Sequence, residues 1–523
     1  MSTKETSVAD SDRRASGLFR TKSIEQSIAD TDEPGKRLRR DLTTWDLIVF
    51  GVAVVIGAGI FTLTAQTAGN VAGPSVSLAF VIAAVACGLA ALCYAEFAST
   101  VPVAGSAYTY SYATFGEFAA WIIGWDLVLE FTLAASVVAK GWSLYLADFL
   151  DDAVSPTVMI GSVEFDWGAV AIVALITGLL VTGTKLSSRV SLVITTIKVA
   201  VVLLVVVVGA FYIDTDNYSP YIPPSESSDT GSGIHQSLLS LVTGAGGSTF
   251  GWYGLLAAAS LVFFAFLGFD VVATTAEETK NPQKALPRGI LGSLVIVTVL
   301  YVAVTVVLSG MVDYRELSGE GATLATAFGI HGLDWASTVI SFGALLGLTT
   351  VVMVLLLGQS RVLFAMSRDG LVPRGLSTTG RHGTPVRITL IVGVVVAALS
   401  GLLPMFTLAE MVNIGTLFAF VLVSIGVVVL RKKRPDLPRG FRVPFVPWIP
   451  ILAVIACLWL MVNLSVETWL RFVGWMVIGI FVYFFYSRRN SVLGKRSAGV
   501  GERDSTTSGD SDAAGAGSSS STD

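Results

Sequence analysis

Long apolar segments alternate with shorter polar connections along most of this chain. The hydrocarbon core of a bilayer is about 30 Å thick, so a helix that crosses it needs about 20 predominantly apolar residues. Charged residues, prolines and glycine clusters bound the apolar segments and allow them to be counted. The pattern predicts twelve membrane helices, at residues 46–67, 76–98, 117–147, 168–184, 190–213, 251–276, 288–311, 334–366, 387–403, 409–430, 448–465 and 469–486. We therefore expect an all-α polytopic membrane protein.

Polar sequence flanks these helices at both ends. Residues 1–40 and 488–523 are rich in Ser, Asp, Gly and Thr, which predicts disordered tails around one membrane domain at 41–487. No apolar segment typical of a cleavable signal peptide precedes the first predicted helix, so we expect that helix to direct membrane insertion.

Positive charges are distributed unevenly between the connections. With the N-terminus inside, the cytoplasmic connections carry Lys185, Arg189, Lys280, Lys284, Arg288, Arg368, Arg374, Arg381, Arg387 and the basic residues between 431 and 442. The connections on the other side carry only Arg315. By the positive-inside rule, this asymmetry predicts that both termini lie in the cytoplasm. We expect a multi-pass protein of the cell (plasma) membrane.

Composition agrees with a membrane location and excludes several function classes. The chain is 53% hydrophobic and 14% charged, whereas soluble proteins are about 25% charged. Its three cysteines lie inside apolar segments, without the spacing of a zinc or redox site. No nucleophile elbow, phosphate-binding loop or basic nucleic-acid stripe is present. We expect no enzymatic activity, no cofactor, no metal and no nucleic-acid partner.

Glycines interrupt two of the predicted helices near their middles. The first helix contains Gly57 and Gly59, and the sixth contains Gly268, two residues before Asp270. Glycine weakens a helix, and unwound backbone within a membrane is tolerated where it lines a cavity. Corresponding interruptions are expected if the chain contains two inverted repeats, at about 46–213 and 251–430, followed by extra helices at 448–486. Close helix packing by small residues is the alternative explanation.

Two ionisable side chains are predicted inside the membrane. Glu130 lies in the middle of the third helix, and Lys198 lies in the inner half of the fifth. A charge in this position costs several kcal/mol unless it is paired or faces water, so both residues are functional candidates. The alternatives are a structural hydrogen bond for Glu130 and snorkelling to the interface for Lys198.

Several motifs together resemble the amino acid–polyamine–organocation (APC) superfamily, specifically the bacterial relatives of the cationic amino acid transporters. They are GAGIF at 57–61, CYAEFASTVPVAGSAYTYSYATFGE at 93–117, GWDLVLEFTLAASVVAKGWS at 124–143, FFAFLGFDVVATTAEETKNPQKALPRGI at 263–290, LLLGQSRVLFAMSRDGLVP at 355–373 and VNIGTLFAFVLVSIGVVVLR at 412–431. The resemblance extends over about residues 40–490. It implies a fold of five plus five helices in inverted repeats, with two further helices.

The resemblance also implies a substrate site at the two interrupted helices. The substrate carboxylate is expected at the unwound first helix, and the amino group at carbonyls of the unwound sixth, with Glu130 nearby. The implied substrate-binding residues are Ile56, Gly57, Ala58, Gly59, Ile60, Glu130, Phe264, Ala265, Leu267 and Gly268. Lys198 matches a lysine that proton-driven relatives place where sodium-driven relatives hold an ion.

Together these features predict a secondary active transporter that takes up amino acids with protons by alternating access. Leu355 on the eighth helix is expected to form a pocket wall that offers no hydrogen bond to a guanidinium, which favours small or medium neutral amino acids. A cationic amino acid or polyamine exchanger or uniporter is the alternative within transport. A non-transporting amino-acid sensor is the alternative from another class.

Overall fold

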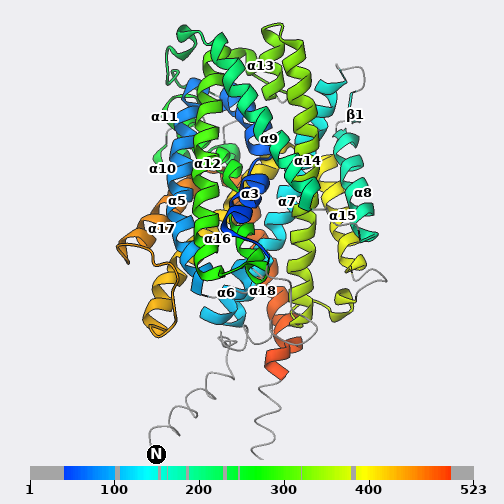
Figure 1. The fold of residues 1–523 in the computed structure, drawn as a ribbon, viewed down its shortest axis with the longest axis vertical. Coiled ribbons are helices and arrows are strands. Elements are labelled where there is room, and N and C mark those ends of the chain that lie inside the picture. Colours follow the sequence, from blue (N-terminus) through cyan, green and yellow to red (C-terminus); the bar gives the residue numbers. More distant parts are fainter. Residues whose placement is uncertain are drawn as a thin grey trace, which may run out of the picture.

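The computed structural model describes residues 41–100, 106–150, 155–161, 163–183, 188–227, 233–244, 248–319, 321–378 and 384–495. Most of its helices run roughly along the long axis of the molecule, with α6 near one end and α13 near the other (Figure 1). The tail predicted at 1–40 and residues 496–523 of the tail predicted at 488–523 lie outside the described residues, whereas 488–495 are described and include the short helix α19.

The described residues of the first half of the chain are mostly helical. They are α3 (Thr44–Val55), α4 (Thr64–Thr67) between two π-helical turns (Gly59–Leu63 and Ala68–Ala72), α5 (Val76–Thr100), α6 (Ser106–Thr114), α7 (Glu117–Phe149), α8 (Trp167–Val181) and α9 (Ser188–Gly209). Strands β1 (Thr157–Ile160) and β2 (Val163–Asp166) form an antiparallel hairpin before α8. The Asp166 carboxylate accepts a hydrogen bond from Ala169 N and so caps the start of α8.

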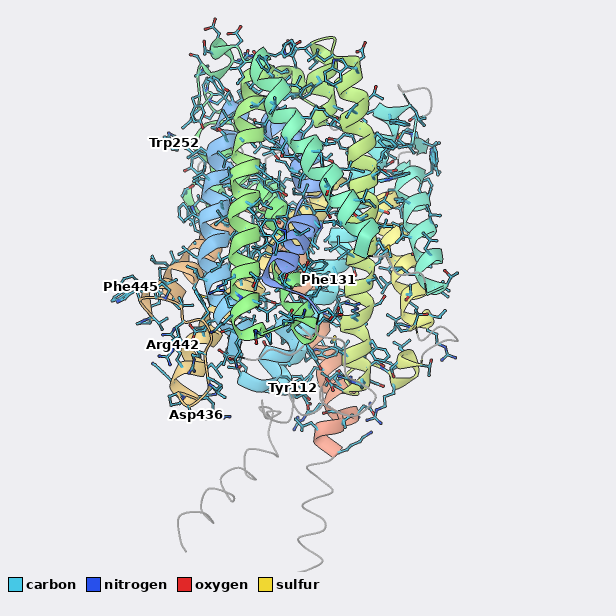
Figure 2. All side chains as sticks on the ribbon, in the orientation of Figure 1. Tyr112, Phe131, Trp252, Asp436, Arg442 and Phe445 are labelled. Atoms are coloured by element: carbon cyan, nitrogen blue, oxygen red, sulfur yellow. The ribbon has the colours of Figure 1, made fainter. Side chains whose placement is uncertain are left out.

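The second half is also helical. Its helices are α10 (Leu238–Thr243), α11 (Gly251–Val262), two 3₁₀ segments (Phe263–Phe266 and Asp270–Glu278), α12 (Pro282–Met311), α13 (Leu324–Ile330), α14 (Asp334–Arg368), α15 (Val386–Leu402), α16 (Met405–Lys433), α17 (Trp448–Val462), α18 (Val466–Val482) and α19 (Arg488–Asn490). Two-residue strands β3 (Glu226–Ser227) and β4 (Ser248–Thr249) precede α11 in the sequence and pair in antiparallel fashion. Figure 2 shows Asp436, Arg442 and Phe445 at the periphery, in the segment between α16 and α17.

The fold is that of a polytopic all-α membrane protein. Among the described residues, eight helical segments are long and apolar enough to cross a membrane. Four shorter apolar helices, α3, α8, α15 and α17, accompany them. The number twelve remains a prediction, because these four are shorter than a full membrane crossing.

Tight packing of α7 against α14 forms the centre of the bundle, with α16 and α15 on the same central helix. On the other side, α12 packs against α5 and α3. The peripheral helices expose apolar side chains, for example Leu470, Val473 and Val477 on α18, as expected for a surface that contacts lipid.

Side-chain and backbone contacts join the last helices to the centre of the bundle. Trp125 on α7 and Trp475 on α18 stack with ring centroids 4.4 Å apart, and each indole N–H donates to the backbone carbonyl of the other residue. Farther along, Ser487 donates to Leu371 O, and Val492 N donates to Asp369 O. Residues 488–495, which follow the end of the predicted membrane domain at 487, therefore pack against the bundle.

Candidate functional site

The first broken helix consists of α3 and the helical stretch 59–72 that follows it. α3 ends at Val55, Ile56 has an extended backbone (φ −69°, ψ 96°), and helical structure resumes with the turn that begins at Gly59. The first N–H groups of a helix have no partner within it, so the new helix start presents free donors and the positive end of its dipole. The break lies at the position that the sequence predicts.

The second broken helix consists of α11 and the two 3₁₀ segments that follow it. The α-helix ends at Val262, and Leu267 then adopts an extended conformation (φ −62°, ψ 144°). Gly268 has a backbone φ of 109°, a value that residues with a side chain rarely adopt. A Cβ there would also lie 2.7 Å from Val54 Cγ1. This break too follows the sequence prediction.

The two breaks touch each other. A Cβ on Gly59 would lie 2.5 Å from Ala265 Cβ and 2.9 Å from Ala265 N, so the backbones of the two broken helices are in direct contact. Both explanations of the glycines therefore apply at different residues. Gly59 allows close packing, whereas a Cβ on Gly57 would meet only Val351 methyl groups at 3.7 Å and Val55 O at 3.8 Å.

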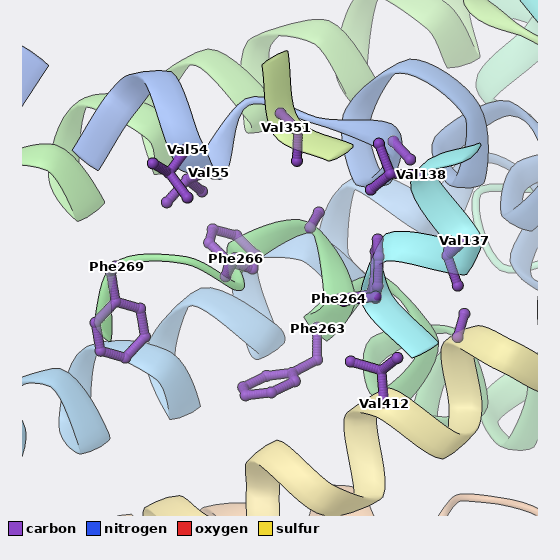
Figure 3. Packing of buried hydrophobic residues seen from close by; sticks show 14 of the residues in the cluster. Val54, Val55, Val137, Val138, Phe263, Phe264, Phe266, Phe269, Val351 and Val412 are labelled. Atoms are coloured by element: carbon purple, nitrogen blue, oxygen red, sulfur yellow. The ribbon is translucent and has the colours of Figure 1, made fainter. Parts of the chain in front are cut away.

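A cavity of about 470 Å³, its open end included, lies between the two breaks and helices α7 and α14. Its lining is mostly apolar and consists of Val54, Val55, Gly57, Ala58, Gly59, Glu130, Phe131, Ala134, Val138, Phe264, Leu267, Gly268, Asp270, Val271, Val351 and Leu355. Figure 3 shows Val351 beside the first broken helix and Phe264 close to Val138, and Phe131 lies near the middle of the bundle (Figure 2).

Most of the residues expected at the site line this cavity. The lining includes Gly57, Ala58, Gly59, Glu130, Phe264, Leu267, Gly268 and Leu355. Ile56, Ile60 and Ala265 lie behind this lining and are fully or almost fully buried. Sequence reasoning did not assign Phe131, Ala134 and Val138 on α7 or Val351 on α14. Helical spacing could have found three of them, because Ala134 and Val138 follow Glu130 at four-residue steps and Val351 precedes Leu355 by four residues.

Lys198 on α9 contacts the first break from outside the cavity lining. Its side chain is buried, and Nζ donates to Ala53 O at 2.8 Å and to Ile56 O at 3.1 Å. Within the described residues Lys198 forms no ion pair, and its amine is hydrogen-bonded to backbone carbonyls instead. Gly347 on α14 makes room for the stem, since a Cβ there would lie 2.9 Å from Lys198 Cε. This burial excludes snorkelling to the interface.

A second donor supports the same break. Tyr301 on α12 is buried, and its hydroxyl donates to Val55 O at 2.8 Å. Tyr301 and Lys198 together bond the carbonyls of residues 53, 55 and 56, which lie at the end of α3, where an α-helix leaves carbonyls without intrahelical partners.

Two buried carboxyl groups form part of the cavity wall. Glu130 and Asp270 both line the cavity and are 6% and 4% exposed. Glu130 is within hydrogen-bonding reach of the Thr416 hydroxyl on α16. Asp126, one turn before Glu130, lies outside the cavity lining, and neither of its carboxyl oxygens has a hydrogen-bond partner among the described residues.

Lys140, toward the far end of α7, has a structural role. Its Nζ pairs with Asp166 at 3.3 Å and donates to Ser400 O, while Ser143 donates to the other Asp166 oxygen at 2.6 Å. This ion pair ties α7 to the start of α8 and to the end of α15, and lies outside the cavity lining.

Comparisons with known proteins agree with this architecture. A family model described as amino acid permease matches residues 42–487. The branched-chain amino acid permease BcaP of Bacillus subtilis (strain 168) is 46% identical, with 91% of this chain and 99% of the relative covered. The methylthioribose transporter of the same organism is 44% identical, with 92% and 100% covered.

A plant relative is more distant. The vacuolar cationic amino acid transporter 4 of Arabidopsis thaliana is 30% identical, with 91% of this chain and 96% of the relative covered. All three relatives are named as permeases or transporters rather than enzymes. The chain belongs to the amino acid permease family of the APC superfamily.

Proposed function

We propose that this protein is a proton-coupled transporter that takes up neutral amino acids with small or medium apolar side chains by alternating access. The observation that carries the proposal is the cavity at the junction of the two broken helices, which is polar at its backbone and at Glu130, and apolar on the rest of its α7 and α14 walls. Such a cavity suits a molecule with a charged head group and an apolar side chain.

The head group would bind to the broken backbone. Free N–H groups at the helix start near Gly57–Gly59 favour a carboxylate, and carbonyls near Phe264–Leu267 favour an ammonium group. Glu130 and Asp270 add negative charge within the same cavity, which also favours an ammonium group. Neither charge of the amino acid would need a side-chain counter-ion of its own.

The substrate's side chain would face the apolar walls. Phe131, Ala134 and Val138 line one wall, and Val351 and Leu355 line another. Burying a leucine- or valine-sized group against them would contribute about 1.5–3 kcal/mol. A guanidinium placed there would lose water without gaining a partner. The name of the Bacillus BcaP relative agrees with a branched aliphatic substrate.

A cationic amino acid is the second candidate. Glu130 and Asp270 are the observation in its favour, because a long substrate could direct its second positive charge at them. The plant relative is named for cationic amino acids. We favour the neutral substrate because the rest of the cavity wall on α7 and α14 is apolar and offers no partner to a charged side chain.

Proton coupling would act through Lys198. A protonated amine binds the carbonyls of Ala53 and Ile56 more strongly than a neutral one, so its protonation would stabilise the contact between α9 and the first broken helix. The protonated amine would itself supply the positive charge in this place, so we expect no need for sodium. The uneven positive charges support a location of both termini in the cytoplasm, with the protein in the plasma membrane as part of the proposal.

A thermal-shift screen of detergent-purified protein tests the substrate proposal. A ligand that binds only the folded state raises Tm. We expect leucine, isoleucine, valine or alanine to raise Tm more than arginine, lysine or putrescine. Methylthioribose serves as a non-amino-acid probe. Stabilisation by cationic compounds alone, or by methylthioribose alone, would overturn the neutral amino-acid proposal.

Uptake by proteoliposomes then separates a transporter from a sensor. We expect labelled amino acid identified in the screen to enter vesicles that contain the protein and not empty vesicles. Binding without any uptake or exchange would support the sensor and contradict the transporter.

A further inference from the structure

The end of α11 leaves backbone carbonyls that need donors. α11 ends at Val262 and gives way to the 3₁₀ turn Phe263–Phe266, whose hydrogen bonds run to the third preceding residue. The last carbonyls of an α-helix have no regular partner within it. These carbonyls lie in the interior of the bundle, where Ser260, Leu261 and Val262 are buried. Leu261 O accepts one backbone bond, from Phe263 N. Without further donors these carbonyls would favour winding the break back into a regular helix.

Asn413 on α16 supplies donors to two of them. Its Nδ2 donates to Ser260 O at 2.8 Å and to Leu261 O at 3.0 Å. The side chain is fully buried, and both amide hydrogens are used. Because both partners are acceptors, only the amide nitrogen can face them, which fixes the orientation of the amide group. Figure 3 shows the preceding residue, Val412, on α16 beside Phe263 and Phe264.

Asn413 mirrors Lys198 in the predicted inverted repeat. α9 and α16 are the last helices of the two predicted repeats, and α3 and α11 are the first. Lys198 on α9 donates to carbonyls at the end of α3, and Asn413 on α16 donates to carbonyls at the end of α11. Each break is therefore supported by a donor from the fifth helix of its own repeat, and only one of the two donors carries a removable proton.

We propose that Asn413 is a positioning residue that holds the second broken helix open for the amino group of the substrate. This inference rests on the proposed function for its ligand, but its structural part does not. The amide donates at every pH, so this break keeps its geometry while the lysine-supported break responds to protons. Asn413 lies outside the cavity lining and acts on the substrate through the backbone of residues 260–267.

Cysteine labelling tests the geometry of the break without a substrate. The native cysteines Cys87, Cys93 and Cys457 are buried, whereas Leu267 is half-buried and lines the cavity. In a Leu267→Cys background, Asn413→Leu removes two hydrogen bonds and should change the rate of thiol labelling by about fivefold or more, which is the effect expected for even one of them. Asn413→Ser, which keeps one donor, should give an intermediate rate.

Asn463 provides the matched control. It too is a buried asparagine at the end of a helix, α17, and its Nδ2 donates to Trp459 O at 2.7 Å. Asn463→Leu removes a similar bond that lies within α17 and does not involve the carbonyls at the end of α11, so it should leave Leu267→Cys labelling unchanged. A labelling rate that responds equally to the variants of Asn413 and Asn463, or to neither, would overturn the inference.

Substrate kinetics give the second readout. Asn413→Leu should raise KM for the transported amino acid more than it lowers kcat, and leave the pH profile in place. A shifted pH profile with normal KM would contradict the positioning role. If no amino acid binds the unmodified protein, the proposed function fails, while the labelling result still decides the role of Asn413.

Discussion

The glycines of the first broken helix have different neighbours, so alanine at each should have a different effect. At Gly57 the added methyl group would face the cavity and meet Val351 at an ordinary 3.7 Å. Gly57 also lacks a positive φ, so alanine fits its backbone. At Gly59 the same methyl group would overlap the backbone of Ala265. Gly57→Ala should therefore weaken ligand binding, and Gly59→Ala should destabilise the fold.

The magnitudes follow from the geometry. A methyl group that enters a tight pocket changes binding by about 1–3 kcal/mol, or about 10–200-fold. Overpacking of a close backbone contact costs about 1–3 kcal/mol of stability. We expect Gly57→Ala to keep its ligand-free Tm and to lose at least about tenfold in affinity. Gly59→Ala should show a lower ligand-free Tm.

Scintillation-proximity binding and ligand-free thermal unfolding in the same detergent measure the two effects separately. Gly88 serves as a control, because a Cβ there would meet nothing within 4 Å. Unchanged affinity in Gly57→Ala together with unchanged Tm in Gly59→Ala would refute the assignment of the cavity to the first break.

Three further predictions concern the walls, the coupling group and the scaffold. Leu355→Ser should enlarge and hydrate the cavity and raise the arginine-to-leucine affinity ratio by about tenfold or more, measured by competition binding; an unmoved ratio would show that Leu355 is not a side-chain wall. Lys198→Met keeps the length of the side chain but removes its donors, so it should retain some substrate binding and lose pH-dependent accumulation in proteoliposomes; accumulation against a gradient by this variant would contradict the role of Lys198. Asp166→Ala removes the partner of Lys140 and the cap of α8, and should lower stability by about 3 kcal/mol without changing substrate preference; a changed preference would place this ion pair in the binding site.

The sequence predicts the breaks well because their cause is local. Gly57, Gly59 and Gly268 interrupt helices through their own backbone freedom, and the structure has breaks at these places. The burial of Lys198 also follows from its position in an apolar helix. The partners of Lys198 are carbonyls of a helix more than a hundred residues away, and the sequence pattern carries no direct record of them.

Other features depend on tertiary contacts. Lys140 resembles a snorkelling residue in the sequence, yet it is paired with Asp166, which the hairpin before α8 brings close. Ala265 belongs to the second break but supports the contact with Gly59 and does not line the cavity. Asn413 carries no charge and lies in an apolar helix, so its role is visible only where its amide meets the end of α11.

Uptake of labelled leucine or valine into proteoliposomes under an imposed pH gradient, acid outside, tests the central claim most directly. The measurement is made in choline buffer without sodium, with a protonophore added in a parallel sample. We expect the labelled amino acid to accumulate transiently inside the vesicles above its external concentration. The protonophore should abolish this accumulation, and sodium should not increase it. Accumulation that requires sodium, or uptake that only reaches equilibrium whatever the pH gradient, would contradict it.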